Sequence, residues 1–179
     1  MCIRDSHYTV YDGRMPDLEA IAQSVAFCRE IRAAVGDRAD ILLGTHGQFT
    51  AGGALRLARQ LEPFDPLWFE EPCPPDMPEE MAKVAADTSI PVATGERLCS
   101  KFEFARVLHL GAAAILQPDL GRAGGILEGK KIAAMAETRY VQVAPHLYCG
   151  PVAAAANIQL AACIPNFLIL ESIGKMDAV

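Results

Sequence analysis

Ionisable residues follow short apolar runs in this sequence. The stretch DPLWFEEPCPP, residues 65–75, ends an apolar run with two adjacent carboxylates, Glu70 and Glu71, and a proline follows at once. A second run ends in Gly-Glu-Arg, with Glu96 at its centre. Later runs lead into further ionisable residues: Asp119, His146 and Glu171. Because carboxylates and imidazoles bind cations and transfer protons near neutral pH, the pattern predicts a catalytic site rather than scattered surface charges.

The elements that must position these residues recur about every 25 residues. The apolar runs are Asp40–Leu43, Leu67–Phe69, Val92–Ala93, Ala114–Gln117, Val141–Ala144 and Phe167–Leu170. Segments with helical periodicity are Leu18–Val35, Ala54–Leu61, Glu79–Ala86, Lys101–Leu108, Gly125–Arg139 and Val152–Cys163. This alternation predicts an α/β fold of parallel strands with outer helices.

Six such units predict most of a (β/α)₈ TIM barrel, with residues 18–179 as a C-terminal barrel domain. An open, doubly wound sheet is the alternative. It would need an early Gly-rich phosphate loop, whereas GRAGG, residues 121–125, comes late and lacks the GxGxxG spacing. Residues 1–17 show neither periodicity, so we expect a loop or a non-native start there, in a chain that is a fragment.

In a barrel, the chemistry lies where the strands end. Since successive strand residues point to opposite sides, only one of Glu70 and Glu71 can face the barrel mouth. Inward carboxylates on neighbouring strands, Glu70 and Glu96, would repel each other without a cation between them, and Mg²⁺ binds carboxylate oxygens.

Amino-acid composition argues against several classes of function. The chain has 179 residues, 51% hydrophobic and 21% charged, with a formal net charge of −6. The basic residues are scattered, which argues against a nucleic-acid partner. No apolar stretch reaches the ~20 residues of a membrane span, and no signal peptide opens the chain. The six cysteines show no metal spacing, which favours reduced thiols in a cytoplasmic protein.

With these residues in place, the sequence resembles the enolase superfamily, in the mandelate racemase-like branch that includes acid-sugar dehydratases. The matching segments are WFEEP, PVATGERL, ILQPDLGRAGGILEGKKIAAMAE, APHLYCGP and FLILES. They follow in the family's order and spacing from about Leu18 onward. The resemblance implies a (β/α)₈ barrel with a separate capping domain. This chain would hold barrel units three to eight, without the capping domain and the first two units.

The resemblance also implies roles for five residues. Glu70 and Glu96 would be ligands of Mg²⁺. Asp119 would hydrogen-bond His146, which would act as an acid or base. Glu171 would lie near a substrate carboxylate oxygen.

Two positions depart from the family pattern. The family's third metal ligand is an Asp, and Gly44 occupies that position, which leaves metal affinity and identity open. His46 follows two residues later, on the same side if the strand continues, and is a candidate acid/base residue or substitute ligand. A rim histidine without such a role is the alternative.

The family's Lys-x-Lys base has no counterpart before His7, so in a fragment that base would lie upstream.

The reaction implied by the resemblance begins with removal of the proton alpha to a carboxylate. The leading hypothesis is a divalent-metal-dependent acid-sugar dehydratase, a hydro-lyase that then eliminates the β-hydroxyl as water. A racemase, epimerase or cycloisomerase on the same scaffold is one alternative, and a metal-independent barrel glycoside hydrolase is another. Arg97 is a candidate for binding substrate, with an ion pair to Glu71 or Asp119 as its other possible role.

We expect the intact protein to be a homo-oligomer acting on a small-molecule sugar acid or another hydroxy acid. We expect this chain on its own to be inactive, because six of eight barrel units would leave exposed strand edges.

Overall fold

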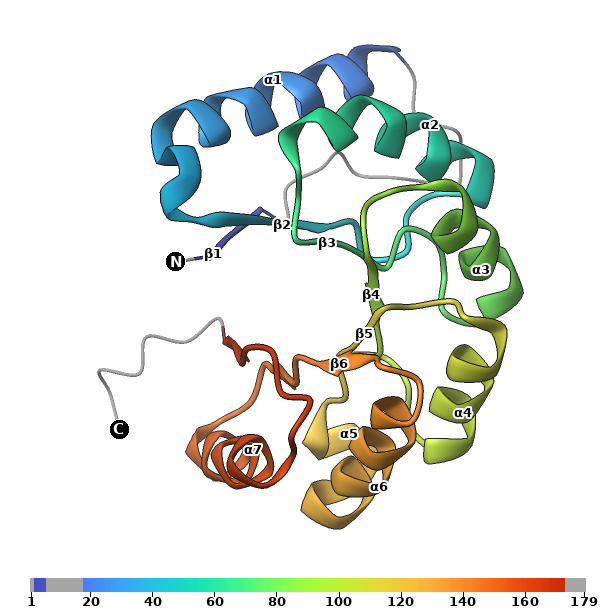
Figure 1. Cartoon of the computed structure of the whole chain (residues 1–179), viewed down its shortest axis with the longest axis vertical. Helices are drawn as coiled ribbons and strands as arrows, with labels where there is room; N and C mark the ends of the chain where they lie inside the picture. The colour runs from blue at the N-terminus through green and yellow to red at the C-terminus, as the bar shows by residue number, and fades with distance from the viewer. Residues whose placement is uncertain (1, 6–17, 173–179) are drawn as a thin grey trace. The chain divides into compact units, whose positions relative to one another are not determined.

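The computed structural model describes residues 2–5 and 18–172, which divide into two compact units between Ala93 and Thr94. In both units short parallel strands alternate with longer helices (Figure 1).

The first unit contains four strands that pair in chain order, all parallel. They are β1 Cys2–Asp5, β2 Asp40–Gly44, β3 Trp68–Glu70 and β4 Val92–Thr94, the last of which ends one residue beyond the unit boundary. The helices are α1 Leu18–Val35, α2 Ala51–Leu61 and α3 Pro78–Asp87, with short 3₁₀ turns η1 Gly36–Arg38 and η2 Glu62–Phe64. Helices α1 and α2 lie together on one side of strands β1 to β3 (Figure 1).

Local sequence explains where these helices begin and which faces they bury. Helix α2 starts after Thr50, whose side chain accepts a hydrogen bond from Gly53 N at 3.2 Å, as an N-cap residue does. Its Leu57 and Leu61, four residues apart, are buried on one face. Helix α3 begins with Pro78, which suits the first helical position because no amide hydrogen is needed there.

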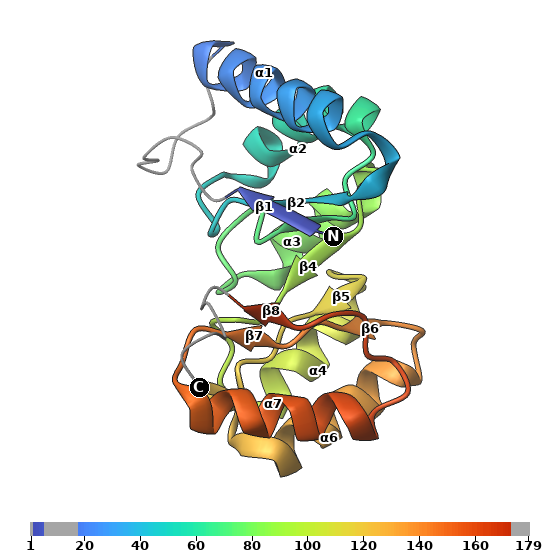
Figure 2. The same ribbon diagram turned by 90° about the vertical axis from the view of Figure 1, so that its left-hand side faces the viewer.

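The second unit contains two parallel strand pairs and four helices. Strands β5 Ile115–Leu116 and β6 Gln142–Val143 form one pair, and β7 His146–Leu147 and β8 Glu171–Ser172 form the other. The helices are α4 Lys101–Leu110, α5 Leu120–Ala123, α6 Gly125–Glu137 and α7 Pro151–Cys163. Figure 2 shows β7 and β8 side by side, with α7 running below them.

Helices α5, α6 and α7 meet at Gly129. A Cβ atom there would lie 2.6 Å from Leu120 Cδ2 on α5 and 3.2 Å from Leu160 Cδ2 on α7. Carbon atoms in contact lie about 3.5–4.0 Å apart, so a side chain at position 129 would force the Leu120 methyl group to move. The close packing fixes α5 against α6.

The six predicted helices all form, with ends that differ by at most three residues from those predicted. Two expectations about strands and loops are wrong. Residues 2–5, predicted within a loop, form β1, because they pair in parallel with β2; residues 6–17 lie outside the described part of the chain. Of the predicted strand 167–170, Phe167 makes a single parallel bridge to Val143, since β6 offers only two residues for pairing.

Two further features concern the described residues alone. None of their helices combines the length and the apolar character that a bilayer span requires. Five cysteines are free thiols: Cys28, Cys73, Cys99, Cys149 and Cys163.

Candidate active site

Four of the predicted site residues come together in the second unit. Glu96 and Asp119 follow strands β4 and β5, whereas His146 and Glu171 are the first residues of β7 and β8. Backbone hydrogen bonds connect these segments in order: Gln117 N to Thr94 O at 2.8 Å, His146 N to Pro118 O at 3.3 Å, and Glu171 N to Pro145 O at 3.2 Å. The carboxylates brought together are buried, with exposed fractions of 8% for Glu96, 4% for Asp119 and 6% for Glu171. The half-buried His146 lies among them.

Asp119 and His146 form a hydrogen-bonded pair. Asp119 Oδ2 lies 2.8 Å from His146 Nδ1, and Asp119 Oδ1 accepts a hydrogen bond from Gly121 N at 2.7 Å, at the start of α5. An ionised carboxylate can only accept, so Nδ1–H is the donor. The pair therefore fixes the imidazole ring and leaves Nε2 as the atom that can exchange a proton or bind a ligand.

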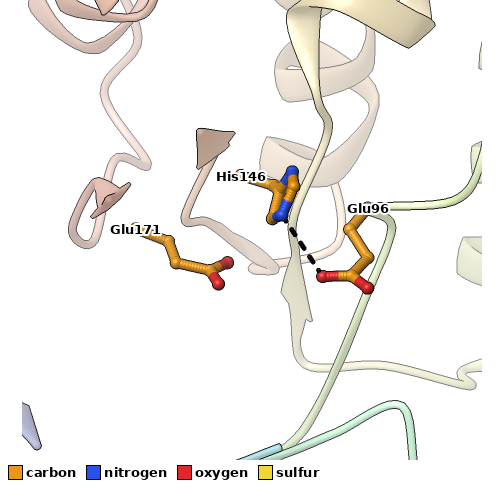
Figure 3. A group of neighbouring side chains, drawn as sticks. All are labelled: Glu96, His146 and Glu171. Carbon is orange, nitrogen blue, oxygen red and sulfur yellow. Dashed lines mark ion pairs between the residues drawn. The ribbon is translucent and has the colours of Figure 1, made fainter. Parts of the chain in front are cut away.

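Glu96 and Glu171 flank the imidazole. His146 Nε2 lies 3.5 Å from Glu96 Oε2, and the dashed line in Figure 3 marks this contact. Glu171 is the registered partner of His146 across the parallel pair β7–β8, which places both side chains on the same face. In Figure 3 the Glu171 carboxylate points toward the other two groups, and one ligand atom from each residue lies within 4.8 Å of the others.

Gln117 holds Glu171 and was missed by the sequence analysis. This fully buried side chain donates a hydrogen bond from Nε2 to Glu171 Oε2 at 3.3 Å. Glutamine carries no charge, so a pattern of ionisable residues does not include it. Its position could have indicated a role, because Gln117 lies two residues before Asp119 and strand side chains two residues apart share a face.

The turn that carries Glu96 requires glycine at its first position. Gly95 has φ +140°, and a Cβ atom there would lie 2.8 Å from Phe104 Cε1 and 2.9 Å from Gln117 N. Leu98 N donates to Gly95 O at 3.1 Å and closes the turn. Arg97 is exposed within this turn, and its role in substrate binding stays a prediction.

A capping box fixes the chain immediately after this turn. The Glu103 Oε2 atom accepts hydrogen bonds from Ser100 N, Ser100 Oγ and Cys99 N at 2.8, 2.8 and 3.1 Å. These bonds lower the pKa of the Glu103 carboxyl, the Ser100 hydroxyl contributing most. Helix α4 thus starts at a defined point, a few residues after Glu96.

In the first unit, Glu70 and Glu71 are both fully buried. Strand β3 ends at Glu70, and Glu71 adopts a left-handed backbone with φ 40°. The alternation argument for the pair therefore does not extend to Glu71. The Glu71 carbonyl accepts hydrogen bonds from Thr45 Oγ1 at 2.9 Å and Gly47 N at 2.6 Å, which join the ends of β2 and β3.

The expectation that the strand continues to His46 is wrong. Strand β2 ends at Gly44, and His46 is an exposed turn residue with φ 51°. The Thr45 and Gly47 contacts to Glu71 turn the backbone there, so spacing from Gly44 does not place the imidazole. Its acid/base role stays a prediction.

Cys73 is buried two residues after Glu71 and is not a nucleophile. Burial, and then the negative charges of Glu80 and Glu71, raise the pKa of its thiol to about 12. It is therefore protonated at neutral pH, where only a thiolate reacts readily.

The donors required for a hard divalent cation are partly present. Glu70, 0% exposed, and Glu96, 8% exposed, are carboxylates whose burial is costly unless positive charge compensates it, and this fits Mg²⁺. Glu70 belongs to the first unit and Glu96 to the second. Gly44 offers no side-chain oxygen, so the family's third ligand is missing from this position.

An apolar pocket of about 400 Å³ lies next to α5. Its lining residues include Leu120, Gly121, Cys149 and Val152, and none of the four clustered ionisable residues. The pocket is therefore separate from the chemistry that these residues can perform.

Comparison with known proteins places this geometry in a family. The model of the enolase C-terminal domain-like family matches residues 9–178, and the chain belongs to that family. The predicted resemblance is therefore confirmed. The predicted α/β fold, with parallel strands and outer helices forming part of a (β/α)₈ barrel, is also confirmed by the solved structures that resemble it.

Individual relatives extend the comparison. A D-galactonate dehydratase of Ralstonia nicotianae is 47% identical over 148 residues, which are 83% of this chain and 39% of the relative. The crystal structure of a mandelate racemase/muconate lactonizing enzyme from Sulfitobacter sp. is 61% identical, with a TM-score of 0.94 over 98% of this chain and 45% of that one. A mandelate racemase/muconate lactonizing enzyme-like protein from Roseovarius sp. TM1035 is 59% identical, with a TM-score of 0.94 over the same shares. The chain spans about two fifths of the length of the curated relatives it matches.

Proposed function

We propose that the protein to which this chain belongs is a hydro-lyase that dehydrates an acid sugar such as D-galactonate. The observation that carries the proposal is the Asp119–His146 pair, set between the buried carboxylates Glu96 and Glu171. The D-galactonate dehydratases among its relatives, 47–48% identical, support the reaction and the substrate class.

His146 acts as the acid in this proposal. With Nδ1–H held by Asp119, a protonated imidazole presents its second proton at Nε2. Transfer of that proton to the β-hydroxyl lets the C–O bond break and water leave. The electron pair comes from the Cα–H bond, whose proton passes to a base, and the enol product tautomerises to a 2-keto-3-deoxy acid. The exposed His46 is a candidate for acid–base work in the same reaction.

Glu171 stabilises the negative charge that develops on the substrate carboxylate. It can donate a hydrogen bond to that oxygen only while protonated. The hydrogen bond from Gln117 Nε2 to Glu171 Oε2 holds the carboxyl group in place. Arg97 is proposed to bind the substrate carboxylate or a hydroxyl group.

Glu70 and Glu96 are the proposed ligands of Mg²⁺. When bound, Mg²⁺ supplies positive charge that stabilises an anionic carboxylate during proton removal. Gly44 leaves the third coordination position to water or substrate, so we expect weaker metal binding than a third carboxylate would give.

A racemase or cycloisomerase is the second candidate, because the similar solved structures carry the names mandelate racemase and muconate lactonizing enzyme. The test incubates the whole protein, and this chain alone, with D-galactonate and related aldonates in deuterated water with Mg²⁺. Formation of a 2-keto-3-deoxy acid supports the proposal. Deuterium at Cα without loss of water supports the second candidate, and full activity after chelation would exclude the metal-dependent reaction.

A further inference from the structure

The cluster of Glu96, His146 and Glu171 has the dimensions of a metal-binding group within one unit. One ligand atom from each residue lies within 4.8 Å of the others. Donor atoms at about 2.1 Å from a tetrahedral Zn²⁺ are about 3.4 Å apart. The 3.5 Å between His146 Nε2 and Glu96 Oε2 matches that separation, and Glu171 is the third residue of the set.

The cluster also carries the hydrogen bonds that hold metal ligands in place. His146 donates its other ring N–H to Asp119 at 2.8 Å, the arrangement found behind zinc-binding histidines. Gln117 donates a hydrogen bond to Glu171 Oε2 at 3.3 Å and orients the carboxylate. Two of the three ligands are thus already oriented by buried partners, which lowers the entropy lost on binding.

The donor atoms favour a cation of intermediate softness. His146 Nε2 lies 3.5 Å from Glu96 Oε2, so an imidazole nitrogen and a carboxylate oxygen lie side by side. A donor set of one imidazole and two carboxylates suits Zn²⁺ better than Mg²⁺, which prefers oxygen alone.

We propose that Glu96, His146 and Glu171 form a Zn²⁺ site, and that Zn²⁺ bound there removes His146 from acid–base chemistry. The ion takes the Nε2 lone pair that would otherwise bind a proton. It also takes Glu96, the residue proposed as an Mg²⁺ ligand, so Zn²⁺ competes with Mg²⁺ and inhibits most when Mg²⁺ is limiting. The site stands on geometry within one unit and does not depend on the proposed dehydratase activity.

The direct test measures metal binding by the chain without substrate. ZnCl₂ affinity is measured against a chromogenic chelator, and CoCl₂ is added separately to record the visible d–d bands of a bound Co²⁺. We expect Zn²⁺ affinity to fall at least ~100-fold in His146→Asn and Glu171→Gln, and ~10–100-fold in Gln117→Leu, as when a ligand's hydrogen-bond partner is removed. The matched control is His109→Asn, because His109 is exposed on α4 and should leave the affinity unchanged.

Several outcomes would overturn the site. Equal Zn²⁺ affinity in unmodified, His146→Asn and Glu171→Gln protein places the ion elsewhere. Thiolate-to-cobalt charge-transfer bands place it on cysteine, and Cys149 is exposed nearby in the sequence. Weak bands typical of six-coordinate Co²⁺ contradict the three-residue tetrahedral site. This measurement uses the unmodified protein alone.

An activity measurement then separates the two proposals. Zn²⁺ that binds at His146 in a protein without dehydratase activity supports this inference and rejects the proposed function. Mg²⁺-dependent dehydration that micromolar Zn²⁺ leaves unchanged at limiting Mg²⁺ supports the proposed function and rejects inhibition through His146.

Discussion

Asp119 accepts hydrogen bonds at both carboxylate oxygens, one from His146 and the other from the start of helix α5. Oδ2 accepts the imidazole Nδ1–H at 2.8 Å, and Oδ1 accepts the amide hydrogen of Gly121 at 2.7 Å. The orientation of the imidazole and the start of α5 are therefore coupled through a single side chain. A variant can separate the two functions, because asparagine caps helices about as well as aspartate.

Asp119→Asn should lower kcat of the whole protein by about 10²–10⁴-fold, the range seen when a histidine loses its orienting carboxylate. The amide cannot accept from Nδ1–H while its own N–H₂ group faces the ring, so the wrong tautomer is favoured. Thermal unfolding should change little. Asp119→Ala should lose similar activity and also about 1 kcal/mol of stability, because the cap is gone. An Asp119→Asn protein with near-normal kcat would contradict the coupling.

Gly95→Ala should destabilise the fold by about 3 kcal/mol or more, since the new methyl group overlaps Phe104 and the Gln117 backbone in addition to straining φ. Gly111 is the matched control. It also has positive φ, +64°, but a Cβ atom there meets no atom within 4 Å, so Gly111→Ala should cost about 1–2 kcal/mol. Urea unfolding of the two variants gives the comparison. Equal losses would mean that backbone strain alone makes glycine necessary at position 95.

Cys73 should make the fold sensitive to alkaline pH. The folded protein raises the pKa of this thiol from 9.0 to about 12, so below pH 9 both folded and unfolded chains keep the proton. Between pH 9 and 12 the unfolded chain loses it and the folded chain does not, which lowers stability by about 1 kcal/mol per pH unit.

Urea unfolding at pH 8, 9, 10 and 11 measures this effect as the difference between unmodified protein and Cys73→Ala. Cys99→Ala is the control, because Cys99 is exposed. If Cys73→Ala follows the same decline with pH as the unmodified protein, the decline has another source.

Glu103→Ala should lower stability by about 1 kcal/mol, because the Glu103 side chain accepts the Ser100 N–H in the capping box. Glu103→Gln keeps an acceptor and should lose less. The lowered pKa of Glu103 adds a dependence on acid: its stabilisation is present above the ordinary value of 4.5 and is lost as pH falls through the folded value. Thermal melts at pH 7 and pH 3 measure this dependence, which should be absent in Glu103→Gln.

Helical periodicity predicted all six long helices because each buries one continuous face, as Leu57 and Leu61 do on α2. The short elements gave no such signal. Helix α5 is four residues long, and β7 and β8 contain two residues each, so no periodicity can develop. Their positions depend on pairing between segments distant in sequence, such as His146 with Glu171.

The candidate-site residues that could be predicted from sequence are those with ionisable side chains. Glu96, Asp119, His146 and Glu171 are ionisable and were named. Gln117 is neutral and was missed, although it holds Glu171. His46 was placed by extending a strand that turns after Gly44, and the contacts that turn it, from Thr45 and Gly47 to the Glu71 carbonyl, join segments far apart in sequence.

The lack of a side chain at Gly129 restricts how the protein can be altered. Position 129 lies on α6, outside the cluster of ionisable residues, yet a larger residue there would force the side chain of Leu120 to move, and Leu120 is the first residue of α5, directly after Asp119. A mutational library aimed at the proposed catalytic residues should therefore hold Gly129 constant as well.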